Sequence, residues 1–270
     1  AGKLLGEGIS PFAITAWRFL IGGAVILPFA IRQGTRDRVK LNIGSILTLG
    51  ALGILNVVVS MLLLQLAIYY GKGPLTAMNP LFVSLFAYII IREKLSSYQV
   101  YSLLMGIAGL LVIILGEKDL LSADYTNLSL GVSFAILAGI TFALYTVLTK
   151  RAVIRYGNSV TNGASFLIGG IILSIINTLI GKTMMFEPSI QNISLILYLG
   201  VIVTGIAYLF YFEAMKTLSA AKASIYFFLK PALASLLAFA FLREHLSITQ
   251  VLGIVLVMLA LSRRLWLKRI

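Results

Sequence analysis

The sequence predicts an all-α membrane protein, a polytopic bundle of helices that cross a lipid bilayer. Hydrophobic residues make up 60% of the 270 residues and charged residues only 11%, whereas an ordinary soluble domain has about 25% charged residues. A soluble chain of this length would need many more charged side chains to cover its core. The apolar residues also form long continuous runs, which favour helices over the alternating strands of a membrane barrel.

Nine apolar runs approach or exceed the length of about 20 residues that a helix needs to cross the hydrocarbon layer. We expect spans at residues 11–31, 42–69, 74–91, 97–115, 128–149, 159–180, 193–215, 223–242 and 247–261. Each run is followed by a connection that carries a basic residue. In chain order these residues include Arg32, Lys72, Arg92, Lys118, Lys150, Lys182, Lys216, Arg243 and Arg263.

Lys and Arg fall mainly in alternate connections, which predicts the orientation because cytoplasmic loops collect positive charge. One set of connections holds fifteen of the 22 basic residues and the other holds five, while Arg18 and Lys230 lie inside spans. We therefore expect Ile270 in the cytoplasm, Ala1 outside, and the protein in the cell inner (plasma) membrane. The net charge of +13 follows from this topology. A nucleic-acid surface would instead need its basic residues on one solvated face.

An internal repeat is the strongest sign of how the chain is organised. Residues 80–100 align without gaps on residues 231–251, with ten identities in 21 positions, and the segment 19–23 recurs at 166–170. By the charge distribution, the Arg92-Glu93 turn and its copy face opposite sides of the membrane, which indicates an inverted repeat. Secondary transporters often have such repeats, because exchanging the conformations of two similar halves opens a central site alternately to each side.

We expect the two repeats at residues 1–122 and 123–270. The second contains five of the expected spans and the first contains four, so we expect an intact protein of ten helices whose first helix is absent from this sequence. The segment 67–80 of the first repeat is also four residues shorter than its counterpart at 214–231.

These features resemble the drug/metabolite transporter superfamily, in particular its EamA-type members with two five-helix repeats. The resemblance covers essentially the whole chain. It is carried by Trp17-Arg18-Phe19, Ala67-Ile68-Tyr69-Tyr70, Phe212-Glu213-Ala214-Met215-Lys216, Ser219-Ala220-Ala221, and the Arg-Glu-x-Leu-Ser turns that follow Pro80 and Pro231. It implies export or exchange of metabolites such as amino acids. The residues before the two prolines, Asn79 and Lys230, depart from the family pattern and could alter substrate choice.

Lys230 is the most informative candidate site residue. It lies eight residues, or about 12 Å at helical rise, from Lys222 at the end of its span, which is too deep for a loop charge. Burying it costs roughly 2.5–3.5 kcal/mol on insertion scales, so it should face a wet cavity or a partner. We expect it to bind an anionic group of the substrate. The alternatives are a structural ion pair with Glu213 or extension toward the membrane surface. Pro231 and its counterpart Pro80 are expected to kink their helices.

Further candidates follow from the repeat and from the neighbouring helix. Asn79 precedes Pro80 as Lys230 precedes Pro231, so the repeat should bring Asn79 and Lys230 to related places near the centre. Tyr208 and Tyr211 precede the connection to the Lys230 helix, and each offers an apolar face with a hydroxyl that needs a partner. For these tyrosines, and for other polar residues within spans, hydrogen bonding between helices is an alternative explanation. The other polar residues include Asn56, Gln65, Asn162, Thr204 and Tyr226.

Arg18 and Glu213 lie near the ends of their spans. Arg18 is a candidate substrate ligand, although its long side chain could equally reach the headgroups or serve in packing. Glu213 is a candidate for proton coupling, with interfacial pairing to Lys216 or Lys222 as the alternative.

The sequence offers no basis for a catalytic, metal or cofactor site. It has no cysteine and a single histidine, His245, and none of the motifs that mark nucleotide cradles or nucleophile elbows. We expect a secondary transporter, an exporter or exchanger of a small anionic or zwitterionic metabolite such as an amino acid, that works by alternating access. The alternative is a non-transporting membrane partner or sensor with a dry, packed centre, and a membrane enzyme ranks third. The solute, direction, coupling ion and oligomeric state are not determined by the sequence.

Overall fold

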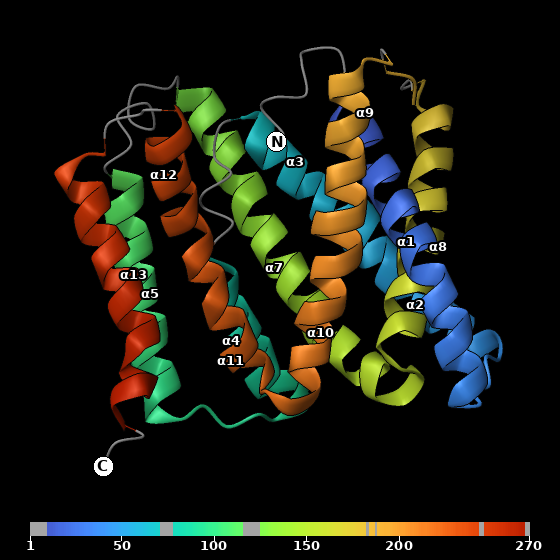
Figure 1. Cartoon of the computed structure of the whole chain (residues 1–270), viewed down its shortest axis with the longest axis horizontal. Helices are drawn as coiled ribbons and strands as arrows, with labels where there is room; N and C mark the ends of the chain where they lie inside the picture. Colours follow the sequence, from blue (N-terminus) through green and yellow to red (C-terminus); the bar gives the residue numbers. More distant parts are fainter. Residues whose placement is uncertain are drawn as a thin grey trace.

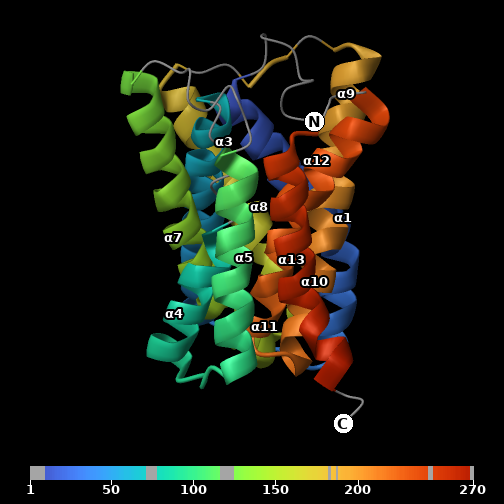
Figure 2. The ribbon, with the colours of Figure 1, turned by 90° about the vertical axis from the view of Figure 1, so that its left-hand side faces the viewer.

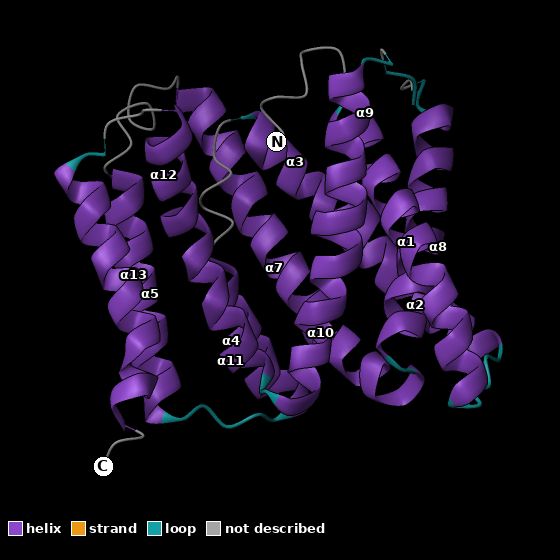
Figure 3. Ribbon diagram, in the orientation of Figure 1, coloured by secondary structure: helices purple, strands orange, loops and turns teal. Residues whose placement is uncertain are grey.

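The computed structural model describes residues 10–70, 78–115, 125–181, 184–186, 188–242 and 246–267. This part of the chain is a bundle of helices without strands (Figure 3). The helix ends gather at two faces of the bundle (Figure 1). We call the end that holds Arg36 and Leu267, at the bottom of Figure 1, the C-side face.

The first half of the chain supplies helices at each of its four expected spans. Its elements are α1 (Pro11–Arg36), the continuous run of α2 (Ile43–Gly53), η1 (Ile54–Ser60) and α3 (Met61–Tyr69), then α4 (Asn79–Ile91) and α5 (Ser97–Leu115). The short segment 67–80 noted in the sequence lies largely outside the described residues.

The second half supplies helices at its five expected spans. Its elements are α7 (Tyr125–Tyr156), α8 (Asn158–Leu179), the run of α9 (Ile190–Leu197), η3 (Tyr198–Ile206) and α10 (Ala207–Thr217), the run of α11 (Ala220–Ile225), η4 (Tyr226–Phe228) and α12 (Leu229–Leu242), and α13 (Ile248–Leu267).

The structure confirms the all-α membrane bundle. Within the described residues, seven helical runs are long and apolar enough to cross a membrane, and two apolar helices, Asn79–Ile91 and Ile248–Ser262, are shorter. The count of nine spans therefore stays a prediction. Several helices also continue past their expected ends: Lys150 and Arg155, expected in a connection, lie in the last turns of α7. Lys and Arg favour helix and interact well with its C-terminal dipole, which explains the extension.

Short polar signals set where the helices begin and turn. Ser10, Asn42 and Ser219 cap α1, α2 and α11, each accepting a hydrogen bond from a backbone N–H three residues on at 2.8–3.1 Å. Gly157 separates α7 from α8 with a φ of 89°, which L side chains rarely adopt. The Gln33 side chain of α1 accepts from the Ser159 backbone N–H at 2.9 Å, so this turn is fastened to α1.

Counterpart helices of the two halves pack against each other around an approximate two-fold axis. α1 lies along α8, its counterpart at an offset of 147 residues, which relates Phe19 to Phe166. These two rings meet edge to face, 5.0 Å between centroids. Gly23 lies against the backbone of Leu167, and at the same offset Gly170 lies against that of Leu20. The contact that Gly23 makes with Leu167 is thus repeated at the equivalent positions, between Gly170 and Leu20.

The same symmetry relates α5 and α13, here at the offset of 151 residues between Pro80 and Pro231. Gly109 lies against the backbone of Gly253, and at the related positions Ser102 donates to the carbonyl of Ala260 at 2.8 Å. The α4–α5 turn lies at the C-side face, whereas α13 begins at the opposite face and runs antiparallel to α5 (Figure 2). The two halves are therefore inverted with respect to each other. The boundary expected between residues 122 and 123 lies outside the described residues.

Candidate functional site

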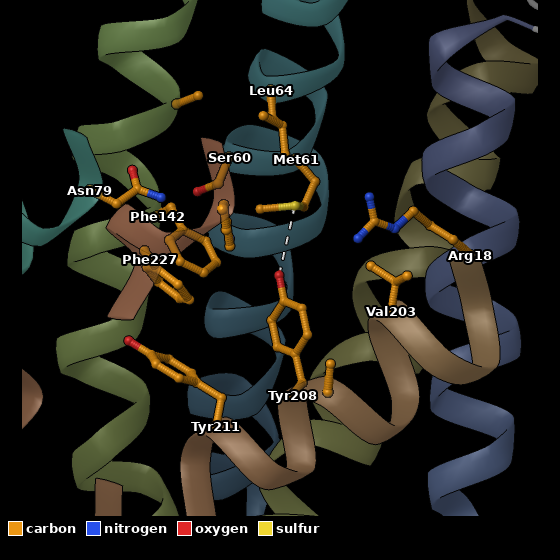
Figure 4. A pocket seen from close by; sticks show the side chains of 13 residues that line it. Arg18, Ser60, Met61, Leu64, Asn79, Phe142, Val203, Tyr208, Tyr211 and Phe227 are labelled. Atoms are coloured by element: carbon orange, nitrogen blue, oxygen red, sulfur yellow. Dashed lines mark hydrogen bonds between the residues drawn. The ribbon is translucent and has the colours of Figure 1, made fainter. Parts of the chain in front are cut away.

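A cavity of about 290 Å³ lies between the two halves (Figure 4). Its volume is near the lower end of the range for small-molecule sites. All five substrate-binding residues expected from the sequence line this cavity: Arg18, Asn79, Tyr208, Tyr211 and Lys230. The remaining lining residues are Ser60, Met61, Leu64, Ala138, Phe142, Val203, Ala207 and Phe227.

Most of the lining consists of positions that the repeat relates to one another. The related pairs are Ser60 with Ala207, Met61 with Tyr208, Leu64 with Tyr211, and Asn79 with Lys230. The cavity therefore lies on the approximate two-fold axis, as the repeat predicted for Asn79 and Lys230. The members of each pair differ in chemistry, so the walls contributed by the two halves are unlike.

Two π-helical segments at positions related by the repeat orient several of the side chains that line the cavity. The π-segment η1 ends at Ser60 and is followed directly by Met61, and η3 ends at Ile206 and is followed by Ala207 and Tyr208. A π turn holds an extra residue and so rotates the residues after it around the helix axis, which is why such segments recur at functional sites. In both long helices, the set of residues that faces the cavity therefore changes at the π-helical segment.

Arg18 points into the space between the halves from α1 (Figure 4). Its side chain is only 7% exposed, and its Nε donates to Oγ1 of Thr204 in η3 at 3.0 Å. Its guanidinium carbon also lies 5.1 Å from the centroid of the Phe19 ring. Extension toward the headgroups, the alternative drawn from the sequence, is not observed because these two contacts hold the side chain inside the bundle.

Lys230 lies near the start of α12, with its Nζ 3.9 Å from the centroid of the Phe227 ring. The alternative ion pair with Glu213 does not form. Glu213 instead binds Lys216 at 2.9 Å and accepts from Nδ2 of Asn158 at 2.9 Å. Glu213 is not among the residues that line the cavity.

Neither cavity cation has a carboxylate partner among the described residues. The described part of the chain contains three carboxylates, Asp37, Glu93 and Glu213. They pair with Arg36 at 2.8 Å, Lys150 at 2.5 Å and Lys216 at 2.9 Å, respectively. Arg18 and Lys230 therefore give the described lining of the cavity a net positive charge.

Buried polar atoms without partners also face this region. Among the described residues, Oδ1 of Asn79, the hydroxyl of Tyr211 and both amide atoms of Asn56 are buried without a hydrogen bond of ordinary geometry. Most buried polar atoms in folded proteins do have a partner. Asn79 and Tyr211 line the cavity, so a bound solute or water could satisfy them. The hydroxyl of Tyr208, by contrast, is 3.7 Å from Sδ of Met61 (Figure 4).

Aromatic side chains form one wall of the cavity. Phe227 stacks on Tyr211 with centroids 4.9 Å apart, and Phe142 lies 6.0 Å from Phe227 and 6.3 Å from Tyr208. Phe142 and Phe227 were not predicted from the sequence, because an apolar residue in an apolar helix gives no signal of its own. Met61 and Leu64 are the repeat counterparts of Tyr208 and Tyr211, so the repeat could have identified them.

The two prolines begin helices. Pro80 occupies the first turn of α4, a position that suits its missing N–H. Pro231 lies in the first turns of α12, directly after the 3₁₀ turn η4. The helix that carries Lys230 is thus interrupted just before the cavity.

A second polar cluster ties three segments together at the C-side face. Glu93, in the α4–α5 turn, binds Nζ of Lys150 of α7 and accepts from the backbone N–H of Ala220 at 2.8 Å. Lys150 also donates to the carbonyl of Leu218 at 3.0 Å. Leu218 and Ala220 flank the α10–α11 turn, so this cluster, which we call the C-side tie, fastens the first half to the second. In the sequence, Glu93 stands out only as part of the repeat.

Comparisons with known proteins are consistent across the chain. The EamA-like transporter family matches residues 1–115 and again residues 129–262. The chain is 32% identical over 265 residues to an uncharacterized transporter of Clostridium kluyveri, covering 96% of this chain and 85% of that protein. It is 28% identical to a chloroplastic WAT1-related protein of Arabidopsis thaliana over 93% of this chain and 62% of that one.

One solved crystal structure has the same fold. It superposes with a TM-score of 0.77 at 20% identity, covering 98% of this chain and 90% of that chain. Together with the helical bundle, these matches confirm the resemblance to EamA-type drug/metabolite transporters and the multi-pass membrane architecture.

Proposed function

The chain belongs to the EamA-like transporter family, and we propose that it moves a small anionic or zwitterionic metabolite across the bilayer by alternating access. The observation that carries this proposal is a cavity on the two-fold axis whose two cations, Arg18 and Lys230, have no carboxylate partner among the described residues. An unpaired charge inside a membrane protein is costly unless water or a counter-charge compensates it. An anionic group of the solute would supply that counter-charge.

The remaining lining suits an amino acid or a related carboxylate. The carboxylate would lie between Arg18 and Lys230. The free Oδ1 of Asn79 accepts hydrogen bonds and would bind an ammonium group. Phe142 and Phe227 offer an apolar surface to a side chain. A zwitterion thus has a complementary group for each of its parts.

The C-side tie supports alternating access. It joins the α4–α5 turn to α7 and to the α10–α11 turn, so it must break if the two halves separate at that face. Closure at one face and access from the other is the arrangement that inverted repeats exchange. We retain the plasma membrane as the location and the cytoplasm as the side of the C-side face, from the charge distribution.

A non-transporting partner or sensor with a dry, packed centre fits less well. Such a protein would have no reason to keep a cavity of about 290 Å³ with unpaired cations and unpartnered polar atoms at its axis. The cavity therefore favours a carrier over this alternative.

Flux in proteoliposomes tests the proposal. The protein would be reconstituted and uptake of labelled phenylalanine, leucine, glutamate and succinate measured against concentration. Lys230→Gln should raise the half-saturation concentration about tenfold to a hundredfold, because hydrogen bonds to charged groups contribute about 1.5–3 kcal/mol. Lys222→Gln is the matched control, since Lys222 lies on the same helical run but not at the cavity. Absence of saturable flux for all four solutes, or equal flux in Lys230→Gln, would contradict the proposal.

A further inference from the structure

A second hollow, of about 810 Å³, lies at the C-side face between the ends of α1, α7 and α10. We call it the basic pocket, because its charged lining consists of five cations and one carboxylate: Arg36, Arg38, Lys40, Arg155, Lys216 and Asp37. It shares no lining residue with the central cavity. The proposed transport site therefore does not explain it.

Most of this positive charge is not neutralised by the protein. Asp37 binds Arg36 at 2.8 Å, and Lys216 binds Glu213. Arg38, Lys40 and Arg155 have no carboxylate in salt-bridge range among the described residues. The hydrogen bond from Arg36 holds the pKa of the Asp37 carboxyl below its usual value, so this carboxylate stays charged and bound to Arg36 at neutral pH.

The backbone and one ring shape the pocket further. Arg38 has a φ of 49°, which is uncommon for a residue with a side chain, and it lies in the tight turn between α1 and α2. The guanidinium of Arg155 lies 5.2 Å from the centroid of the Tyr156 ring. The cations thus come from an ordered turn and a helix end, at the level where α1 and α7 leave the apolar part of the bundle.

An apolar groove continues from the basic pocket into the bundle surface. The groove has a volume of about 410 Å³, and its apolar lining comes from α2, η1 and α7, including Ala51, Leu55 and Leu148. It shares Arg155 and Tyr156 with the basic pocket. The cationic hollow at the C-side face therefore adjoins an apolar groove along the helices, with Arg155 and Tyr156 between them.

We propose that the basic pocket and this groove together bind an anionic phospholipid. The phosphate of the headgroup lies among Arg38, Lys40 and Arg155, and one acyl chain lies in the groove over Ala51 and Leu55. Anionic lipid headgroups bind basic pockets between transmembrane helices. A soluble anion would use the cations but leave the groove empty, and basic residues that served topology alone would need no adjoining groove.

Lipid titration of the purified full chain in detergent tests this site. The probes are dioleoylphosphatidylglycerol, dioleoylphosphatidylcholine and inorganic phosphate, and the readouts are the apparent dissociation constant and the shift of the thermal midpoint. Phosphatidylglycerol should bind and stabilise the protein more than phosphatidylcholine, and inorganic phosphate should have little effect. A basic residue near an anionic membrane contributes a factor of about fivefold, so Lys40→Gln and Arg155→Gln should each weaken phosphatidylglycerol binding about fivefold.

Matched variants separate the headgroup, the acyl chain and general surface charge. Ala51→Trp should fill the groove and weaken phosphatidylglycerol binding without changing charge, whereas Ala24→Trp, on an exposed part of α1 outside the groove, should not. Lys94→Gln removes an exposed cation of the same face that does not line the pocket, and should leave binding unchanged. Equal stabilisation by inorganic phosphate, an equal loss in Lys94→Gln, or unchanged binding in Ala51→Trp would each overturn the proposal.

Discussion

Breaking the C-side tie is expected to open the cavity toward the C-side face. The perturbation is Lys150→Met, which keeps a long side chain and removes the ammonium. It leaves Glu93 with the backbone N–H of Ala220 as its hydrogen-bond donor in the tie and removes the donor to the Leu218 carbonyl. The contact between Glu93 and Lys150 joins the two halves, whereas the contact between Lys150 and Leu218 lies within the second half. Loss of the Glu93–Lys150 contact therefore destabilises the closed arrangement and leaves an opened one largely unaffected.

The structure sets the size of this effect. Exposed ion pairs contribute about 0–1 kcal/mol, and removing one partner of a buried pair costs about 3–5 kcal/mol. The Lys150 and Glu93 side chains are 14% and 17% exposed, so the pair is screened in part and an intermediate cost of about 2 kcal/mol is appropriate. Since about 1.4 kcal/mol corresponds to a factor of ten, the ratio of open to closed protein should rise about thirtyfold.

Cysteine labelling measures that ratio, because the sequence contains no cysteine. Ala207→Cys places a single thiol on the cavity wall. In proteoliposomes, a membrane-impermeant maleimide applied from the C-side face should react about thirtyfold faster in Lys150→Met than in the parent, up to the rate of a fully open cavity. Lys94→Met is the control for loss of a cation at this face.

The double variant Glu93→Gln/Lys150→Met refines the result. It removes the unpaired carboxylate as well, so its labelling rate should fall between those of the parent and Lys150→Met. Unchanged labelling from the C-side face in Lys150→Met, or an equal rise in Lys94→Met, would refute the reasoning that the tie holds this face closed.

Two further predictions concern stability. Gly109→Ala should lower the thermal midpoint by an amount that corresponds to about 1–3 kcal/mol of overpacking, because an added Cβ would meet the carbonyl oxygen of Gly253 at 2.8 Å. Gly34→Ala is the control and should leave the midpoint unchanged, because the nearest atom to its Cβ would be 3.7 Å away. Equal losses in the two variants would show that the α5–α13 contact is not tight. Thr161→Val should raise the midpoint, because it replaces a buried hydroxyl that has no hydrogen bond with a methyl group of the same size, and leaving such a group unpaired costs about 1–3 kcal/mol; a lower midpoint in thermal unfolding would show that the hydroxyl is bonded through water.

Much of the fold and part of the site could be predicted, because each follows from a pattern in the order of residues along the sequence. Apolar runs located the helices, and the duplicated segment around Pro80 and Pro231 located the axis. The repeat alone predicted that Asn79 and Lys230 would occupy related places near the centre, and both line the cavity. Composition and the alignment of the two repeats were sufficient to predict these features, since inverted halves bring equivalent positions to the same region.

The rest depends on contacts between distant segments that no local pattern records. The π-helical segments η1 and η3 lie within ordinary apolar runs, so nothing in the sequence distinguished them from α-helix. The partner of Arg18 is Thr204, 186 positions away, and the C-side tie joins Glu93 to residues more than 50 positions later in the chain. Glu213 is an alternative partner that the sequence offers for Lys230, but in the structure its carboxylate binds Asn158 and Lys216.

Along the α1–α8 contact the two halves agree where they pack, whereas the positions that line the cavity differ between the halves. Phe19 and its counterpart Phe166 are identical and pack against each other, whereas Lys230 corresponds to Asn79 and Arg18 corresponds to Ser165. This difference bears on the proposed mechanism. One cation therefore comes from each half. Because like charges repel, the empty cavity disfavours the approach of Arg18 and Lys230, and an anion bound between them removes that repulsion. In a carrier built this way, the bound solute itself stabilises the conformations in which both halves close on it, and those are the conformations through which alternating access must pass.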